Sequence, residues 1–114
     1  MSTEPGTVKF VGSIIKRNDL SFEEFLKHWT EVHTTFWTGA NAEATHLLKY
    51  VVNPIDRRQH PDSPIDGFAE LWFPSQQALD DAFAGAIGQA AMADMPNFTE
   101  RLFIAYVVEI PVVP

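Results

Sequence analysis

The sequence predicts an α+β fold in which a four-stranded antiparallel sheet carries two helices on one face. The main observation is the order of the patterned segments, which runs strand, helix, strand, strand, helix, strand. That order is the split βαβ arrangement of ferredoxin-like domains. The composition agrees, because 114 residues that are 46% hydrophobic and 20% charged suffice for one packed core. We therefore expect residues 1–114 to form a single domain, with residues 1–6 as a short flexible arm.

The first strand and the first helix are the most clearly marked elements. Residues 8–16 (VKFVGSIIK) are rich in β-branched side chains, which favour a strand. Ser21, followed three residues later by Glu24, forms a capping box that begins a helix. Apolar side chains recur at helical spacing from there to about Trp37, and Gly39 is a natural stop beyond them. This helix should pack one apolar stripe against the sheet.

The middle of the chain is predicted to hold a strand and a long loop. Residues 40–45 either add one helical turn or form a connection. Residues 46–53 (HLLKYVVN) form the second strand, which we expect to end before Pro54 because proline cannot donate to a sheet ladder. The polar residues 54–64 form a loop, which is either a mobile functional segment or a solvated connection.

The second half of the chain supplies the remaining strands and the second helix. Residues 66–73 (DGFAELWF) form the third strand. Ser75 caps the second helix, residues 90–95 form a short turn or helix, and residues 101–110 form the fourth strand. Alternation along the third strand sorts its side chains onto two faces, with Ala69, Leu71 and Phe73 on one and Phe68, Glu70 and Trp72 on the other.

Two helices cover only one face of a four-stranded sheet, and the other face is not polar here. It carries Phe68 and Trp72, and the first and fourth strands offer large apolar residues on both faces. A sheet face this apolar should be covered. Because the chain has no spare elements, we expect a second copy to cover it, which gives a homodimer whose sheets pack face to face.

The bulk composition argues against several classes of function. The 8 Lys+Arg against 15 Asp+Glu give a net charge of −7, so nucleic acids and anionic membrane surfaces would be repelled. The absence of cysteine excludes disulfides, thiol nucleophiles and thiolate metal sites. No metal-binding or phosphate-binding spacing is present, and nothing resembles a signal peptide or a membrane span. We expect a soluble cytoplasmic protein without metal or cofactor.

His33 is the main candidate for chemistry. It lies roughly 40° from the centre of the helix stripe at Trp29, so its imidazole points inward, whereas His28 lies on the flank and diverges from it. The macrodipole at this end of the helix favours a protonated imidazole, and burial favours a neutral one. A histidine under opposed influences can transfer protons near pH 7. The alternative is a core histidine that hydrogen-bonds a backbone carbonyl.

Glu70 is the second candidate, and two interpretations of it stay open. Its aromatic neighbours would raise its pKa, as suits a general acid or base. Alternatively, it pairs with Lys9, Lys49 or Arg101 on a partly solvated edge. Several aromatic side chains either contact a ligand or serve only as packing: Tyr50 and Tyr106 as phenol donors, and Trp29, Trp37 and Trp72 as walls.

Three segments carry a resemblance to a known family. SFEEFLKHWTEVH (residues 21–33) is similar to a signature S-x-E-E-F-x-x-x-W-x-x-x-H, and DGFAELWF resembles a characteristic third strand. Ala93-Asp94 followed by Phe98 is similar to an A-D-x-x-x-F motif before the last strand. These segments, which together span most of the chain, resemble the EthD family of the dimeric α+β barrel superfamily.

The resemblance implies the fold reached above, the same homodimer, and a pocket between the sheet and the helices of each subunit. Similar proteins include a methylmuconolactone isomerase, fungal decarboxylases and dehydratases of polyketide pathways, and haem- or quinol-oxidising monooxygenases. Most of them use no cofactor. The isomerase resembles this sequence at His33, at Lys49-Tyr50 and at Glu70-x-Trp72, but residues 37–45 depart from it and leave the substrate open.

The leading hypothesis is a cofactor-independent acid–base enzyme that isomerises, decarboxylates or dehydrates a compact cyclic or aromatic carbonyl compound. His33 would be the base or acid, Glu70 its partner across the cavity, and Tyr50 a donor to the developing enolate oxygen. The substrate would contact Trp29, Trp37, Phe68, Trp72 and Tyr106. The alternatives are a cofactor-free monooxygenase acting on a quinol or anthrone, and a non-catalytic dimer that binds a hydrophobic metabolite for a degradative oxygenase.

Overall fold

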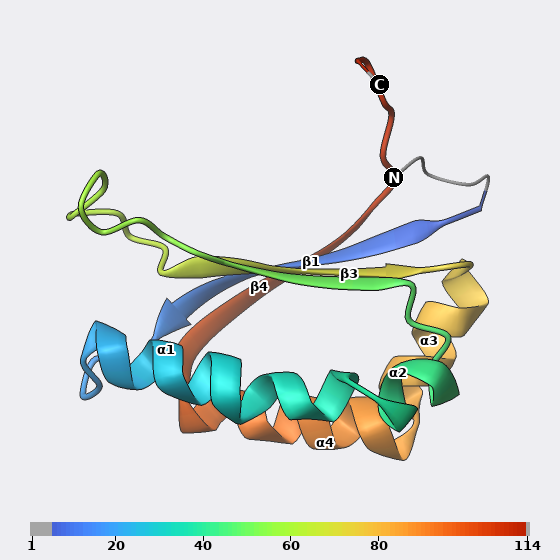
Figure 1. Cartoon of the computed structure of the whole chain (residues 1–114), viewed down its shortest axis with the longest axis horizontal. Coiled ribbons are helices and arrows are strands. Elements are labelled where there is room, and N and C mark those ends of the chain that lie inside the picture. Colours follow the sequence, from blue (N-terminus) through green and yellow to red (C-terminus); the bar gives the residue numbers. More distant parts are fainter. Residues whose placement is uncertain (1–5, 114) are drawn as a thin grey trace.

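The computed structural model describes residues 6–113, and in it one antiparallel sheet carries all the described helices on the same face (Figure 1). The strands are β1 (Val8–Lys16), β2 (Lys49–Pro54), β3 (Gly67–Phe73) and β4 (Thr99–Val107). The helices are α1 (Phe22–Glu31), α2 (Ala40–Ala44), α3 (Gln76–Ala84) and α4 (Ala86–Asp94), with 3-10 turns η1 (His33–Trp37) and η2 (Met95–Asn97). The sheet order is β2-β3-β1-β4, and all neighbours are antiparallel. The predicted ferredoxin-like α+β fold is confirmed.

The two faces of the sheet differ as the alternation along β3 predicts. Ala69, Leu71 and Phe73 are buried on the side of the helices. Phe68, Glu70 and Trp72 point to the opposite face, which we call the open face because no described helix lies on it (Figure 1). None of the helices between residues 6 and 113 combines the length and apolarity that crossing a bilayer requires.

The first helix begins where the sequence predicts but ends earlier. Ser21 and Glu24 form a reciprocal capping box, with hydrogen bonds of 2.9 and 3.0 Å. The α-helix ends at Glu31, and the chain continues to Trp37 as a 3-10 turn. Branching at Cβ disfavours the α-helix, and threonine hydroxyls compete for its carbonyls. The β-branched residues concerned are Thr30, Val32, Thr34 and Thr35. The hydroxyls of the three threonines donate to backbone carbonyls three or four residues back.

Other boundaries differ from the prediction by a few residues. β2 begins at Lys49 and includes Pro54, which is tolerated because β2 is an edge strand. The short turn or helix expected at residues 90–95 is the longer α4, and β4 begins two residues and ends three residues earlier than expected. The predicted flexible arm lies, apart from Gly6, outside the described residues.

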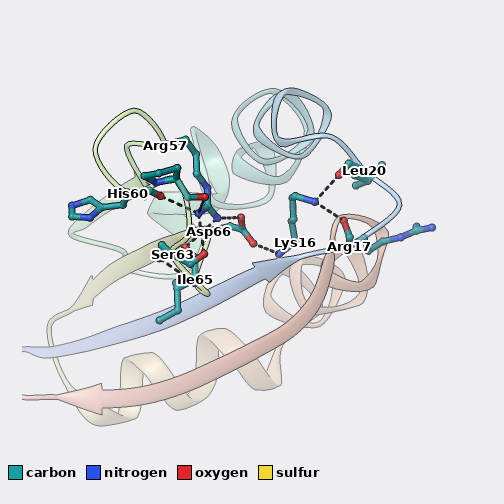
Figure 2. A network of polar contacts seen from close by, with 9 residues as sticks. Lys16, Arg17, Leu20, Arg57, His60, Ser63, Ile65 and Asp66 are labelled. Atoms are coloured by element: carbon teal, nitrogen blue, oxygen red, sulfur yellow. Dashed lines mark hydrogen bonds and ion pairs between the residues drawn. The ribbon is translucent and has the colours of Figure 1, made fainter.

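The loop between β2 and β3 is fixed by one arginine (Figure 2). The Arg57 guanidinium donates to the carbonyls of His60 and Ser63 at 3.2 and 2.9 Å and pairs with the Asp66 carboxylate. Asp66 also accepts from the backbone N–H of Lys16 at 2.8 Å. The loop is therefore tied to the end of β1, which favours a structural connection over a mobile segment.

The helices approach closely where α3 meets α4. A Cβ built on Gly88 would lie 2.2 Å from the Ala82 carbonyl oxygen and 2.6 Å from Phe83 Cα. Both neighbours are backbone atoms, so they cannot move aside as a flexible side chain would. Gly88 is therefore required by packing, although glycine weakens a helix interior.

Replacing Gly88 by Ala tests this packing, because two effects act in opposite directions. Helix propensity alone would stabilise the protein by about 1 kcal/mol. We expect the steric clash to prevail and the free energy of unfolding to fall by about 2 kcal/mol or more, measured by urea denaturation. Ala90→Gly, at an exposed position of the same helix, is the matched control for propensity alone. A Gly88→Ala variant more stable than the parent would contradict the close approach.

Candidate active site

A small cavity lies between the sheet and the helices, and apolar side chains form most of its wall. Its volume is about 30 Å³, which is room for about two water molecules. The side chains with nitrogen or oxygen that line it are those of Trp29, His33, Trp37 and Tyr50, all predicted from the sequence. Within residues 6–113, no cluster of three or more histidine, aspartate or glutamate side chains is placed to hold a metal ion.

The carboxylate of Asp94, the last residue of α4, lies between two histidines. His33 Nδ1 is 2.8 Å from Oδ2, and His28 Nε2 is 3.0 Å from both oxygens. Asn97 donates to Oδ1 at 3.0 Å. An ionised carboxylate only accepts, so each imidazole presents an N–H to it. The prediction that the two histidines diverge is wrong, because the chain tightens into a 3-10 turn after α1 and His33 turns to the same carboxylate.

The ionisation of this cluster follows from burial and from its hydrogen bonds. Burial lowers the pKa of His33 below its ordinary 6.5, and Asp94 opposes this fall without cancelling it. Burial alone would raise the pKa of Asp94, but its bonds to Asn97, His33 and His28 bring it below the ordinary value. Near pH 7 the site therefore holds an ionised Asp94 and a neutral His33. Because His33 Nδ1 carries the proton facing Asp94, Nε2 keeps a free lone pair, and the His33 side chain lines the cavity.

The Phe98 ring packs against both imidazoles. Its ring is fully buried and lies 4.8 Å from the His28 ring and 4.9 Å from the His33 ring, between centroids. Sequence reasoning gave neither Asp94 nor Phe98 a role. The signal that could have found them is the A-D-x-x-x-F segment, because its aspartate is Asp94 and its phenylalanine is Phe98.

Tyr50 and Trp29 bring two further donors to the cavity. Burial raises the pKa of the Tyr50 phenol to about 12, while the neighbouring Trp29 indole acts to lower it. The phenol therefore stays protonated at neutral pH and can donate a hydrogen bond. The Trp29 side chain is fully buried, and its Nε1–H has no hydrogen-bond partner among the described residues, although the Tyr50 hydroxyl lies nearby.

Glu70 does not face this cavity. It lies on the open face, where it pairs with Lys9 and accepts a hydrogen bond of 2.9 Å from Asn53. Burial would raise the pKa of Glu70, but Lys9 and Asn53 outweigh burial and bring it below the ordinary value. Of the two interpretations left open for Glu70, the pairing with Lys9 is observed and the rise in its pKa is not; the expected partnership with His33 across the cavity is wrong. The reason is strand alternation, because Ala69 and Leu71 line the cavity and residue 70 points away from it.

Three of the predicted ligand contacts also lie elsewhere. Phe68 and Trp72 are on the open face, where Trp72 lies between the ammonium groups of Lys9 and Lys49 at 4.6 and 4.8 Å from its ring centroid. Tyr106 is half-exposed on the edge strand β4, with its ring 6.2 Å from that of Phe10. None of the three lines the cavity.

A wider groove adjoins the cavity at two shared side chains. Trp37 and Tyr50 line both spaces, and the groove beyond them has a volume of about 270 Å³. Its other wall includes Gly39 and Leu48, at the two ends of the α2 connection. The two aromatic side chains therefore separate the cavity from an open groove on the surface.

Comparisons with known proteins place the chain in a family. No curated protein sequence matches it significantly. An EthD family protein from Bacillus halodurans is 18% identical with a TM-score of 0.74, over 91% of this chain and 99% of that chain. A hydroxynitrile lyase from Passiflora edulis is 11% identical with a TM-score of 0.73, over 97% of this chain and 100% of that chain. SnoaB, a cofactor-independent oxygenase from Streptomyces nogalater, is 11% identical with a TM-score of 0.70, over 96% of this chain and 98% of that chain. At these identities the likeness establishes the shared fold. The family model for the EthD domain matches residues 17–102, most of the sequence, and the chain therefore belongs to the EthD family.

Proposed function

We propose that this chain is a cofactor-independent enzyme that moves a proton on a compact cyclic or aromatic carbonyl compound. The observation that carries the proposal is the buried, neutral His33, which lines an apolar cavity while Asp94 holds its Nδ1. The fold of this chain is shared with a hydroxynitrile lyase and with a cofactor-independent oxygenase, which supports proposing lyase chemistry and catalysis without a cofactor.

His33 is the base in this proposal. Its Nε2 takes a proton from the carbon next to the carbonyl group, and Asp94 stabilises the imidazolium that forms. The electron pair of the broken C–H bond moves into the carbonyl and gives an enolate, whose oxygen accepts a hydrogen bond from the Tyr50 phenol. His33 then returns the proton to another carbon in an isomerisation, or gives it to a departing hydroxyl in a dehydration. In a decarboxylation, His33 Nε2 takes the proton of the substrate's carboxylic acid, the C–C bond breaks to release CO₂ and leave the enolate, and His33 returns that proton to the carbon.

The cavity must widen to admit such a substrate. A volume of about 30 Å³ is far below the ~300 Å³ of common ligand sites. Met92 and Met95 form part of the wall, and methionine side chains repack easily. We infer that substrate enters from the adjoining groove, past Trp37 and Tyr50, which line both spaces.

A cofactor-free oxygenase reaction is the second candidate, favoured by the fold shared with SnoaB. The same base would deprotonate a quinol or anthrone, whose anion then reacts directly with O₂. Oxygen consumption in the presence of an electron-rich phenol separates this reaction from proton transfer alone. A chain that only binds a hydrophobic metabolite would give saturable binding without turnover.

We also propose that the chain forms a homodimer through the open face. Phe68, Ser13 and Phe103 lie in one row across β3, β1 and β4, and Phe103 is 51% exposed. A small residue between two large aromatic ones leaves a furrow that the same face of a second copy can fill. Burial of these apolar side chains would favour association.

Replacing His33 by Gln tests the proposed base. The assay follows hydrogen–deuterium exchange at the α-carbon of cyclohexanone and γ-butyrolactone in D₂O by NMR. We expect the variant to lose catalysed exchange by about 100-fold or more, because a positioned base contributes that much. Asp94→Asn should lower the rate as well, and Glu70→Gln, on the open face, is the matched control that should retain it. Full exchange activity in His33→Gln would contradict the proposal.

Replacing Phe103 by Glu tests the proposed dimer. Light scattering should give the parent protein twice the 12.8 kDa chain mass at micromolar concentration, and the variant the mass of one chain. A charge on this face opposes burial in the interface. Val32→Glu changes an exposed apolar residue on the helical side and should leave the dimer intact. A parent protein that is monomeric at this concentration would rule out the interface.

A further inference from the structure

The indole of Trp29 carries a polar atom that the mechanism above does not use. The side chain is 0% exposed, and its Nε1–H makes no hydrogen bond within 3.5 Å to any acceptor among residues 6–113; the Tyr50 hydroxyl lies just beyond, near enough for the indole to lower the phenol pKa as a weak donor. Buried donors are nearly always paired, so an unpaired one at a cavity marks a place for an acceptor. The indole N–H of Trp72, on the other side of the sheet, is paired instead, because it donates to Glu109 at 2.7 Å.

Gly67 fixes the position of the Trp29 ring by contact with its six-membered ring, at the edge away from Nε1. A Cβ on Gly67 would lie 2.5 Å from Trp29 Cζ3 and 2.6 Å from Cη2, so the benzo edge of the indole occupies the space that any larger residue would take. Gly67 lies at the start of β3, in register with Ile14 and Pro54. The rigid sheet therefore holds the indole, and Gly67 is a positioning residue for its N–H.

The charge of the cavity wall restricts the ligand. No lysine or arginine side chain is among the described residues that line it. The titratable groups that do line it are His33, neutral near pH 7, and Tyr50, protonated there. An anionic ligand would be buried without a compensating charge, which is costly. The wall thus suits an uncharged molecule with an oxygen acceptor.

We propose that the Trp29 Nε1–H, together with the adjacent Tyr50 hydroxyl, binds the carbonyl oxygen of an uncharged cyclic ketone or lactone. This inference rests on the function proposed above and names its substrate class. The two donors fix the carbonyl oxygen at one end of the cavity, and the carbon to be deprotonated then lies toward His33. Compounds of the same shape that carry an ionised carboxylate are excluded by the uncharged wall, so among the reactions proposed above this inference favours isomerisation and dehydration over decarboxylation.

The test is an NMR titration of the indole N–H resonances of the whole protein with three ligands of one size. Cyclopentanone carries the acceptor, methylenecyclopentane has the same shape without it, and cyclopentanecarboxylate carries a charge. We expect cyclopentanone to move the Trp29 Nε1–H resonance downfield and to leave that of Trp72 in place. Methylenecyclopentane should bind without this downfield shift, and the carboxylate should bind at least about tenfold more weakly than the ketone. Equal shifts with all three ligands, tighter binding of the carboxylate, or no saturable binding of the ketone would overturn the proposal.

Trp29→Phe removes the indole N–H but keeps a large aromatic ring, so it tests the hydrogen bond apart from the packing of the side chain. We expect it to weaken cyclopentanone binding about five- to tenfold, which corresponds to one neutral hydrogen bond. The affinity for methylenecyclopentane should stay within about twofold, an outcome that a merely structural role of Trp29 would not give. If this variant does not fold, the titration of the parent protein still decides the matter. Unchanged cyclopentanone affinity in a folded Trp29→Phe variant would overturn the proposal.

His33→Gln distinguishes this inference from the proposed function. In this variant cyclopentanone at saturation should still move the Trp29 Nε1–H resonance downfield, because the oxygen contacts Trp29 and Tyr50 and not the base. A retained shift with lost exchange supports both proposals. A retained shift with full exchange supports the oxygen site and removes the proposed role of His33, and cyclopentanone that binds without the shift overturns the oxygen site.

Discussion

The carboxylate of Asp94 is the constraint on which the helical side of the molecule depends. It is buried where α4 ends, and it accepts hydrogen bonds from His28 on α1, His33 on η1 and Asn97 on η2. A buried carboxylate is tolerable only with such donors, and the histidines in turn take their orientation from it. One charge therefore joins four segments of the chain and decides which nitrogen of His33 is free.

The sheet separates two chemically different regions. On the helical side, alternate residues of the strands contribute apolar side chains to the cavity, and its polar atoms come from α1, η1 and β2. On the open face, Lys9 pairs with Glu70 and Glu109, and Trp72 lies between two lysines. A single-residue shift in strand register would exchange these regions, so the register of β3 against β1 is as important for the site as any side chain in it.

Much of the fold could be predicted from the sequence, because strand alternation, the capping box of Ser21 and the order of elements are local signals. Four cavity residues were also within reach, since the inward His33, the tryptophans Trp29 and Trp37 and the phenol of Tyr50 are visible in the sequence as candidate site residues. The partner of His33 was not, because Asp94 is 61 positions away and a hydrogen bond across that separation leaves no periodic trace. The sequence placed Glu70 on the correct face of β3, but its aromatic neighbours and then the resemblance assigned it to the site of His33, against that placement. The early end of α1 was missed because each of its β-branched residues weakens the helix only slightly.

The measurement that tests the central claim most directly is an NMR titration of the His33 imidazole nitrogens. We expect a midpoint below 6.5 and, above that midpoint, a neutral ring protonated on Nδ1 with a bare Nε2. Because Asp94 raises the pKa of His33, Asp94→Asn should lower the midpoint further, while Glu70→Gln, across the sheet, should leave it unchanged. A midpoint above 6.5, a ring protonated on Nε2, or a midpoint that responds to Glu70 and not to Asp94 would contradict the assignment of His33 as the base of this site.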